Sequence, residues 1–284
     1  MTMILTPAQS EIIRQTIRSC GQQAKSLAAQ HYDVFQKTPG DFVTSVDQAL
    51  DRRFTEFFTD LFPHDGVITE ENAASRKQYQ EGFSRLWCID PIDGTGDFIR
   101  GDHDYAIHVG LLEDQQPIAG WICAPHYDLT YWGDAQSGVW QAQGDEVPQL
   151  CRVPGAQALT QYRVIIGDRD FRKLRDMIVD TMPEVRFVRT GGSFGLKVMS
   201  VVLGQTDLYL YFNRRVKVWD TAAPIALAQA AGLVCCDLSG APLSFAPQAL
   251  DLETLAHQQP IVIGWAPYID ALLPRLRDAI DPEL

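Results

Sequence analysis

The sequence lacks an uninterrupted run of about 20 apolar residues, the length that a membrane-spanning helix needs. Its start, Met1 to Ser10, has no basic region followed by an apolar core, so it does not resemble a secretory signal. We therefore expect a cytoplasmic protein with no membrane partner. With 284 residues, of which 46% are hydrophobic, the chain can bury a sizeable core and is long enough for two domains.

Cysteine and histidine are too scattered for a zinc site or a disulfide framework. The six cysteines show no C-x-x-C spacing, and the adjacent Cys235 and Cys236 lie in an apolar run, so we expect buried free thiols. The six histidines form no H-E-x-x-H pair, and the chain has neither a G-x-S-x-G elbow nor a P-loop. Gly94 and Gly96 resemble the start of a dinucleotide fingerprint, but Ile99 stands where the third glycine belongs.

Positive charge is also scarce, since the formal net charge is -12. This argues against a nucleic-acid polymer or an acidic membrane as a partner, because both are bound through basic patches. A small anion can still bind where metal ions reverse the sign of the local field.

The stretch from Trp87 to Phe98 combines a candidate metal site with a candidate anion site. An apolar run that predicts a short buried strand ends in Asp90 and Asp93. The intervening proline favours an extended backbone, so both carboxylates and the Ile92 carbonyl could point to one place. Residues 94–96 can turn the chain into a helix whose first N–H groups face the same corner. Oxygen ligands of this kind suit Mg2+, or Mn2+, better than zinc.

Two helices are predicted at the N-terminus. Thr6-Pro7 has the composition of a helix start, and apolar residues follow at a spacing of about 3.6. After the polar and then apolar residues 36–44, Ser45 and Gln48 match a capping box for a second helix. Asp47 lies in its first turn, where a carboxylate complements the helix dipole.

The rest of the first half predicts an α+β arrangement. A short strand at 67–69 ends in Glu70-Glu71, which could be a surface pair or part of a site, and the polar residues 72–84 predict a loop. Apolar segments then recur between turn residues, as expected for an antiparallel meander. These segments are 106–112, 119–124, 129–133 and 139–141.

In the second half, predicted strands alternate with helical segments, which is typical of an α/β domain. The strands are 164–166, 185–188, 208–212, 233–236 and 261–264. A polar, proline-bearing segment at 145–158 separates this half from the first. We therefore predict an N-terminal domain over 1–150 and a C-terminal domain over 151–284, the latter supplying Asp220 from the start of a helix, where it could equally be an N-cap.

The candidate site residues are all acidic: Glu70, Asp90, Asp93 and Asp220, with Asp47 as a fifth. Most of them lie at the end of a predicted strand or the start of a predicted helix, where functional sites are usually built. Carboxylates about 4 Å apart repel one another by about 4 kcal/mol at an effective dielectric constant of about 20, so a converging cluster needs about two or three divalent ions.

Such a cluster could carry out metal-assisted hydrolysis of a phosphomonoester. A phosphate would bridge the ions and accept hydrogen bonds from the N–H groups at Gly94 and Thr95, while a metal-activated water attacks phosphorus in line. Thr95 could pass the proton of that water towards Asp47 or Glu70, and a second water near Asp220 could protonate the leaving group.

Together these motifs resemble the inositol monophosphatase superfamily, whose members are Mg2+-dependent, lithium-sensitive phosphatases. The motifs are Asp41-Phe-Val-Thr44-x-x-Asp47, Ile68-Thr-Glu70-Glu71, Trp87-x-x-Asp90-Pro-Ile-Asp93-Gly-Thr95-x-Asp97-Phe98, Gly192-Ser193 and Trp219-Asp220-Thr-Ala-Ala. The resemblance implies a layered αβαβα fold. It also implies two metal sites, one formed by Glu70, Asp90 and the Ile92 carbonyl and one by Asp90, Asp93 and Asp220, with a third ion held by Glu70 mainly through water.

The resemblance further implies that Gly94 and Thr95 hold the phosphate and that Thr95 and Asp47 activate water. Departures from the family pattern concern the substrate. Where inositol phosphatases usually carry a glutamate, residues 212–218 read Phe-Asn-Arg-Arg-Val-Lys-Val. The segment from Ser193 to Lys197 ends in Leu-Lys, which is similar to the branch that removes the 3'-phosphate of 3'-phosphoadenosine 5'-phosphate. The expected substrate-binding residues are Ser193, Lys197, Asn213, Arg215 and Asp220.

We therefore predict a Mg2+-dependent phosphomonoesterase that acts on an inositol monophosphate or a related sugar phosphate. The alternative is a 3'(2'),5'-bisphosphate nucleotidase, and a remoter one is a non-catalytic metal-binding or scaffold member of the fold. The predicted partner is a small phosphate ester, and a homodimer is possible.

Overall fold

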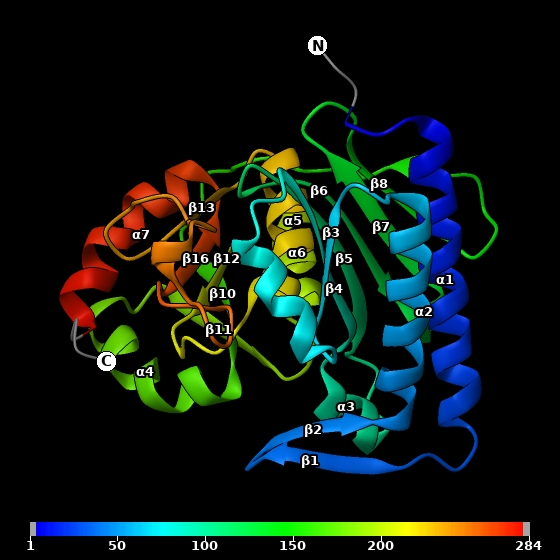
Figure 1. Cartoon of the computed structure of the whole chain (residues 1–284). Coiled ribbons are helices and arrows are strands. Elements are labelled where there is room, and N and C mark those ends of the chain that lie inside the picture. The colour runs from blue at the N-terminus through cyan, green and yellow to red at the C-terminus, as the bar shows by residue number, and fades with distance from the viewer. Residues whose placement is uncertain (1–3, 281–284) are drawn as a thin grey trace.

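Helical layers and two sheets alternate across the molecule in the computed structural model, which describes residues 4–280 (Figure 1). The layers are α1 (Pro7–Ala28) with α2 (Ser45–Leu61), a seven-stranded sheet, α5 (Phe194–Val202) with α6 (Val218–Ala230), a five-stranded sheet, and α4 (Asp168–Thr181) with α7 (Ala266–Ala279). This order confirms the predicted αβαβα sandwich.

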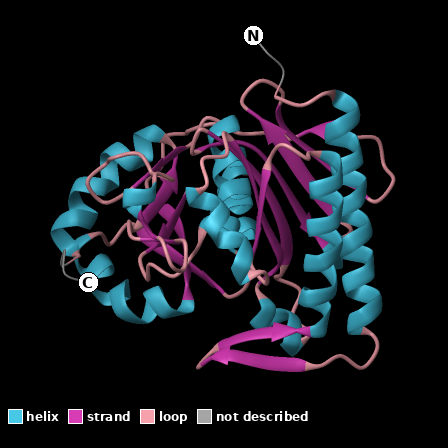
Figure 2. Ribbon diagram, in the orientation of Figure 1, coloured by secondary structure: helices cyan, strands magenta, loops and turns pink. Residues whose placement is uncertain are grey.

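The seven-stranded sheet contains the predicted meander. In spatial order its strands are β3 (Gly66–Thr69), β4 (Arg85–Asp93), β5 (Ala106–Glu113), β6 (Gln116–Ala124), β7 (Leu129–Asp134), β8 (Gly138–Gln143) and β9 (Gln149–Leu150). Only the β3–β4 pair is parallel, and the other pairs are antiparallel. Helices cover both faces of this sheet (Figure 2), which explains why β4 and β5 are buried along nearly their whole length.

The five-stranded sheet is mixed. Its spatial order is β11 (Val185–Thr190), β10 (Tyr162–Gly167), β12 (Leu208–Tyr211), β16 (Ile261–Gly264) and β13 (Val234–Cys236). Strand β10 is parallel to both of its neighbours, whereas β16 is antiparallel to both of its own. The remaining short elements of the second half are β14 (Leu250–Asp251), β15 (Ala256–His257) and a 3-10 helix (Pro247–Ala249).

Helix α6 joins the two halves of the chain, because it packs directly on the seven-stranded sheet. A Cβ added at Gly110 of β5 would lie 2.5 Å from the Cβ of Ala222, and one at Gly120 of β6 would lie 2.4 Å from the Ala223 carbonyl oxygen. Glycine on the sheet and alanine on the helix therefore permit this close approach. The start of α6, which carries Asp220, is thereby held near strands of the first half.

The sequence analysis mispredicted one segment and missed a hairpin. Residues 72–84, predicted as a loop, contain a 3-10 helix over Ala73–Gln80 that buries Ser75 and Tyr79. Two buried residues four apart leave no apolar periodicity to detect. The polar segment before α2 contains β1 (Val34–Thr38), which pairs with β2 (Asp41–Thr44) in an antiparallel hairpin. All of β1 is exposed, so its sequence carries no alternation of apolar and polar residues.

All six cysteines are free and buried, as predicted. Within residues 4–280, no helix is long and apolar enough to cross a membrane.

Candidate active site

Three carboxylates meet where the two halves of the chain come together. Glu70 follows β3, Asp90 lies near the end of β4 and Asp220 lies in the first turn of α6. Each offers an oxygen, and these oxygens all lie within 4.8 Å of one another. Because β3 and β4 are parallel, their carboxyl ends share one edge of the sheet, and the packing of α6 brings Asp220 to the same place.

Asp93 is held beside this group by the start of α5. Its Oδ2 accepts a hydrogen bond of 2.6 Å from the Ser193 hydroxyl and one of 3.3 Å from the Gly195 N–H. The Nε2 atom of His108 lies 3.2 Å from the same oxygen and 3.2 Å from Ser193 Oγ. These contacts anchor one oxygen of Asp93 and leave the other for a different partner.

The sequence analysis missed His108. It is completely buried in β5, and a Cβ added at Gly195 would lie 2.2 Å from its Nε2. Burial lowers the pKa of His108 and outweighs the opposite effect of the Asp93 charge, which favours the neutral imidazole. The sequence offered one signal for His108, namely a histidine within an apolar run that predicts a strand.

Asp47 connects α2 to Thr95. Its Oδ2 accepts the Thr44 N–H at 2.8 Å, and its Oδ1 lies 3.2 Å from the Thr95 hydroxyl. The predicted capping box of Ser45 and Gln48 was wrong, because the N-cap is Thr44 and its partner at the third helical position is Asp47. Burial raises the pKa of Asp47 to about 6, although the hydrogen bonds from Thr44 oppose this shift.

The turn after β4 places Thr95 at the start of the short helix α3 (Thr95–Arg100). The Thr95 hydroxyl also lies 3.0 Å from the Ile92 carbonyl oxygen, a possible acceptor. Gly94 has a φ of 97°, and a Cβ there would lie 3.2 Å from the Ser193 nitrogen, so a larger residue would be both strained and crowded. As first-turn residues, Thr95 and Gly96 have N–H groups without an acceptor inside the helix.

Asp220 occupies the third position of α6 rather than its N-cap, so the N-cap alternative was wrong. The N-cap residue is Lys217, whose N–H donates to Asp220 Oδ2 at 2.7 Å. Burial raises the pKa of Asp220 to about 7, which the Lys217 charge opposes and the charge of Glu70 reinforces.

The electrostatics of the cluster are those of a cation site. Burial raises the pKa of Asp90 far above its ordinary value, and the charges of Glu70 and Asp93 add to this effect. Burial also disfavours the charged form of Glu70, but the ammonium groups of Lys37 and Lys217 more than offset it, and the pKa is lowered. Clustered carboxylate oxygens that are costly to ionise on their own fit a hard divalent ion.

The predicted substrate-binding residues have different surroundings. Ser193 and Lys197 lie in the wall of a cavity of about 450 Å³. The Lys197 ammonium is buried and donates to the Gly192 carbonyl at 2.6 Å and to the Ser193 carbonyl at 3.3 Å, so it braces the turn before α5. Asn213 accepts a hydrogen bond from the Tyr211 hydroxyl, and Arg215 is exposed.

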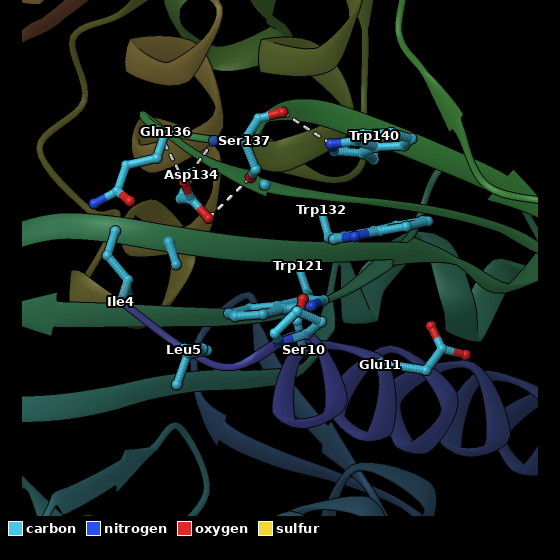
Figure 3. A pocket seen from close by; sticks show the side chains of 13 residues that line it. Ile4, Leu5, Ser10, Glu11, Trp121, Trp132, Asp134, Gln136, Ser137 and Trp140 are labelled. Atoms are coloured by element: carbon cyan, nitrogen blue, oxygen red, sulfur yellow. Dashed lines mark hydrogen bonds between the residues drawn. The ribbon is translucent and has the colours of Figure 1, made fainter. Parts of the chain in front are cut away.

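Another cavity, of about 470 Å³, lies away from these residues (Figure 3). Trp121, Trp132 and Trp140 line it from the neighbouring strands β6, β7 and β8, and Ile4 and Leu5 close it near the start of α1. It contains none of the predicted site residues, so we do not assign it to the reaction.

Comparison with known proteins decides the family. The model for the inositol monophosphatase family matches residues 4–264. The chain belongs to the inositol monophosphatase family. It is therefore a phosphatase of this family, a phosphoric monoester hydrolase, and the family uses divalent metal ions.

Individual relatives fall into more than one branch of the inositol monophosphatase family. An inositol-1-monophosphatase of Bacillus subtilis is 25% identical over 83% of this chain and 87% of its own length. The 3'(2'),5'-bisphosphate nucleotidase CysQ of Escherichia coli O157:H7 is 29% identical over 82% of this chain and 92% of its own length. The solved structure of the extragenic suppressor protein suhB from Bartonella henselae has a TM-score of 0.77 at 22% identity, over 96% of this chain and all of that one, and it supports the fold.

Proposed function

We propose that the protein is a Mg2+-dependent phosphomonoesterase that hydrolyses a small phosphate ester. The observation that carries this proposal is the meeting of Glu70, Asp90 and Asp220, from three separate elements, within 4.8 Å. Oxygen donors favour Mg2+, and Mn2+ can serve in the same place. Two ions, or three, are proposed, and a homodimer remains a prediction of the family resemblance.

Glu70, Asp90 and the Ile92 carbonyl would hold one ion, and Asp90, Asp93 and Asp220 another. Bound ions of this kind polarise a phosphate and lower the pKa of water. The chain contributes orientation: Asp90 Oδ1 accepts the Ile92 N–H at 2.9 Å, and Asp93 Oδ2 is anchored by Ser193. Asp90 and Asp93 therefore each keep one oxygen fixed by the protein.

Thr95 and Asp47 are proposed to move the proton of the attacking water. The Thr95 hydroxyl is within hydrogen-bonding distance of Asp47 Oδ1, so it can accept a proton while it donates its own to the carboxylate. The N–H groups at Gly94 and Thr95 are proposed to bind the phosphate oxygens, because they lie at a helix start beside the carboxylates.

The proposed substrate is an inositol monophosphate or a related sugar phosphate, and the alternative is a 3'(2'),5'-bisphosphate nucleotide. The similarity to CysQ and the cavity beside Ser193 and Lys197 support the alternative. The similarity to the Bacillus subtilis enzyme supports the first. A comparison of kcat/KM for inositol 1-phosphate, fructose 1,6-bisphosphate, histidinol phosphate and 3'-phosphoadenosine 5'-phosphate distinguishes them.

Removal of one carboxylate tests the proposed class. We expect Asp93→Asn to lower Mg2+-dependent phosphate release by about 100-fold or more, because it removes a charged oxygen at the reacting centre. The matched control is Asp134→Asn. Asp134 lines the cavity formed by Trp121, Trp132 and Trp140, away from the carboxylate cluster, so this variant should keep the wild-type rate. The assay measures inorganic phosphate released from p-nitrophenyl phosphate, with Mg2+ and with EDTA. Full turnover by Asp93→Asn would contradict the proposal, and wild-type protein that neither binds Mg2+ nor releases phosphate would favour the non-catalytic alternative.

A further inference from the structure

Two lysines approach the same oxygen of Glu70 from opposite halves of the chain. Lys37 of β1 places its ammonium 3.2 Å from Glu70 Oε1, and Lys217 places its own 3.6 Å from that atom. Glu70 is one of the three clustered carboxylates, so both ammonium groups lie beside an oxygen that is proposed to bind a divalent ion.

The two lysines are held differently. Lys37 also lies 2.7 Å from Glu71 Oε1, and it belongs to an exposed strand, so it has a second partner to which it can turn. Lys217 is the N-cap of α6, and its backbone also forms a bridge with Ala256.

The side chain of Lys217 also has an aromatic partner. Its ammonium lies 5.4 Å from the ring centroid of Trp219, which is completely buried. An ammonium over an indole face is attracted by the ring, so this contact holds the charge near Glu70 and Asp220.

We propose that the Lys217 ammonium is a built-in cation of this site, which occupies one side of Glu70 and limits the number of divalent ions that the carboxylates bind. A divalent ion at Glu70 Oε1 would have to share that oxygen with a positive charge a few ångströms away, and the two cations repel each other. This inference rests on the proposed function, because it concerns the same carboxylates. It favours two ions over three.

Titration calorimetry of the metal-free full chain with MgCl2 tests the proposal. We expect Lys217→Met, which keeps the length of the side chain but removes its charge, to bind one further Mg2+ or to bind its weakest Mg2+ about tenfold more tightly. Lys217→Arg keeps the charge and is the matched control, so its isotherm should equal that of the wild type. Lys217→Gln repeats the neutral substitution in case Lys217→Met does not fold, and circular dichroism establishes the fold of each variant.

The outcomes separate the two proposals. Wild-type protein that binds Mg2+ together with a Lys217→Met isotherm that is unchanged, or weaker, overturns the role of Lys217 alone. Wild-type protein that binds no Mg2+ overturns both. A tighter or additional ion in the neutral variants, and not in Lys217→Arg, supports Lys217 as the built-in cation.

Discussion

At the scale of single residues, the site depends on partners that hold each carboxylate by one oxygen. Asp47, Asp93 and Asp220 each accept hydrogen bonds at Oδ2, and the donors come from Thr44, from the start of α5 and from Lys217. An anchored carboxylate loses little rotational freedom when it binds a cation, which favours tight and specific binding.

The packing of His108 against Gly195 gives a prediction at this scale. Gly195→Ala would place a Cβ 2.2 Å from His108 Nε2, so we expect it to destabilise the protein by about 1–3 kcal/mol through overpacking. In a His108→Ser background the same change should cost much less, because the ring is gone. Urea unfolding of the wild type, both single variants and the double variant measures this coupling. Equal costs in both backgrounds would contradict the predicted contact.

The buried His257 predicts a pH dependence of stability. Burial lowers the pKa of His257 to about 4, and its Nε2 lies 2.8 Å from the Thr221 hydroxyl. The folded pKa of His257 lies below the unfolded value of about 6.5. The neutral, buried His257 therefore contributes its full stability above a pH of about 6.5, and this stability is lost as the pH falls. We expect the free energy of unfolding to fall by about 3 kcal/mol between pH 7 and pH 4 from this group alone. Urea unfolding in EDTA should show a flatter profile for His257→Gln.

At the scale of elements, long periodic segments were predictable and short or exposed ones were not. The strands of the meander and the start of α1 at Thr6 follow from patterns within a few residues of one another. The hairpin strand β1 was missed because none of its residues is buried. The capping box of α2 was predicted one residue late, since Ser45 and Thr44 are both good N-caps and only the backbone geometry selects between them.

The contact between α6 and the seven-stranded sheet gives a prediction at the element scale. Gly110→Ala would bring a Cβ to 2.5 Å from Ala222, so we expect a loss of about 1–3 kcal/mol in stability. Displacement of α6 also moves Asp220, and Mg2+ affinity measured by calorimetry should fall with stability. Gly167→Ala is the control, because no atom lies within 4 Å of its added Cβ. A Gly110→Ala variant with the stability and the Mg2+ affinity of the wild type would contradict this prediction and would show that α6 tolerates displacement.

At the scale of the whole molecule, the proposed domains over 1–150 and 151–284 share a core. One cluster of buried residues contains Ile68 and Ile122 from the first half and Val198 and Leu227 from the second. The ends of two strands and of one helix complete the acidic cluster only when these halves are packed together. The division into domains stays a prediction, but the packing argues that neither half is stable alone.

This shared core predicts a single unfolding transition. We expect fluorescence and far-ultraviolet circular dichroism to report the same urea midpoint, because loss of either half exposes the core of the other. Mg2+ should raise that midpoint, since it binds carboxylates from both halves only in the folded state. Two separate transitions would indicate independent domains.

The sequence alone determined the local features of this protein. The position of Asp90 and Asp93 at the end of a strand, and the turn after them, follow from neighbouring residues. The resemblance to a phosphatase family follows from several short motifs spread along the chain. The resemblance implied that Glu70 and Asp220 both bind metal beside Asp90, but only the tertiary structure shows that their oxygens meet and that Lys217 lies against Glu70. These residues are far apart along the chain, and their distance depends on how α6 packs on the seven-stranded sheet, which no local pattern encodes.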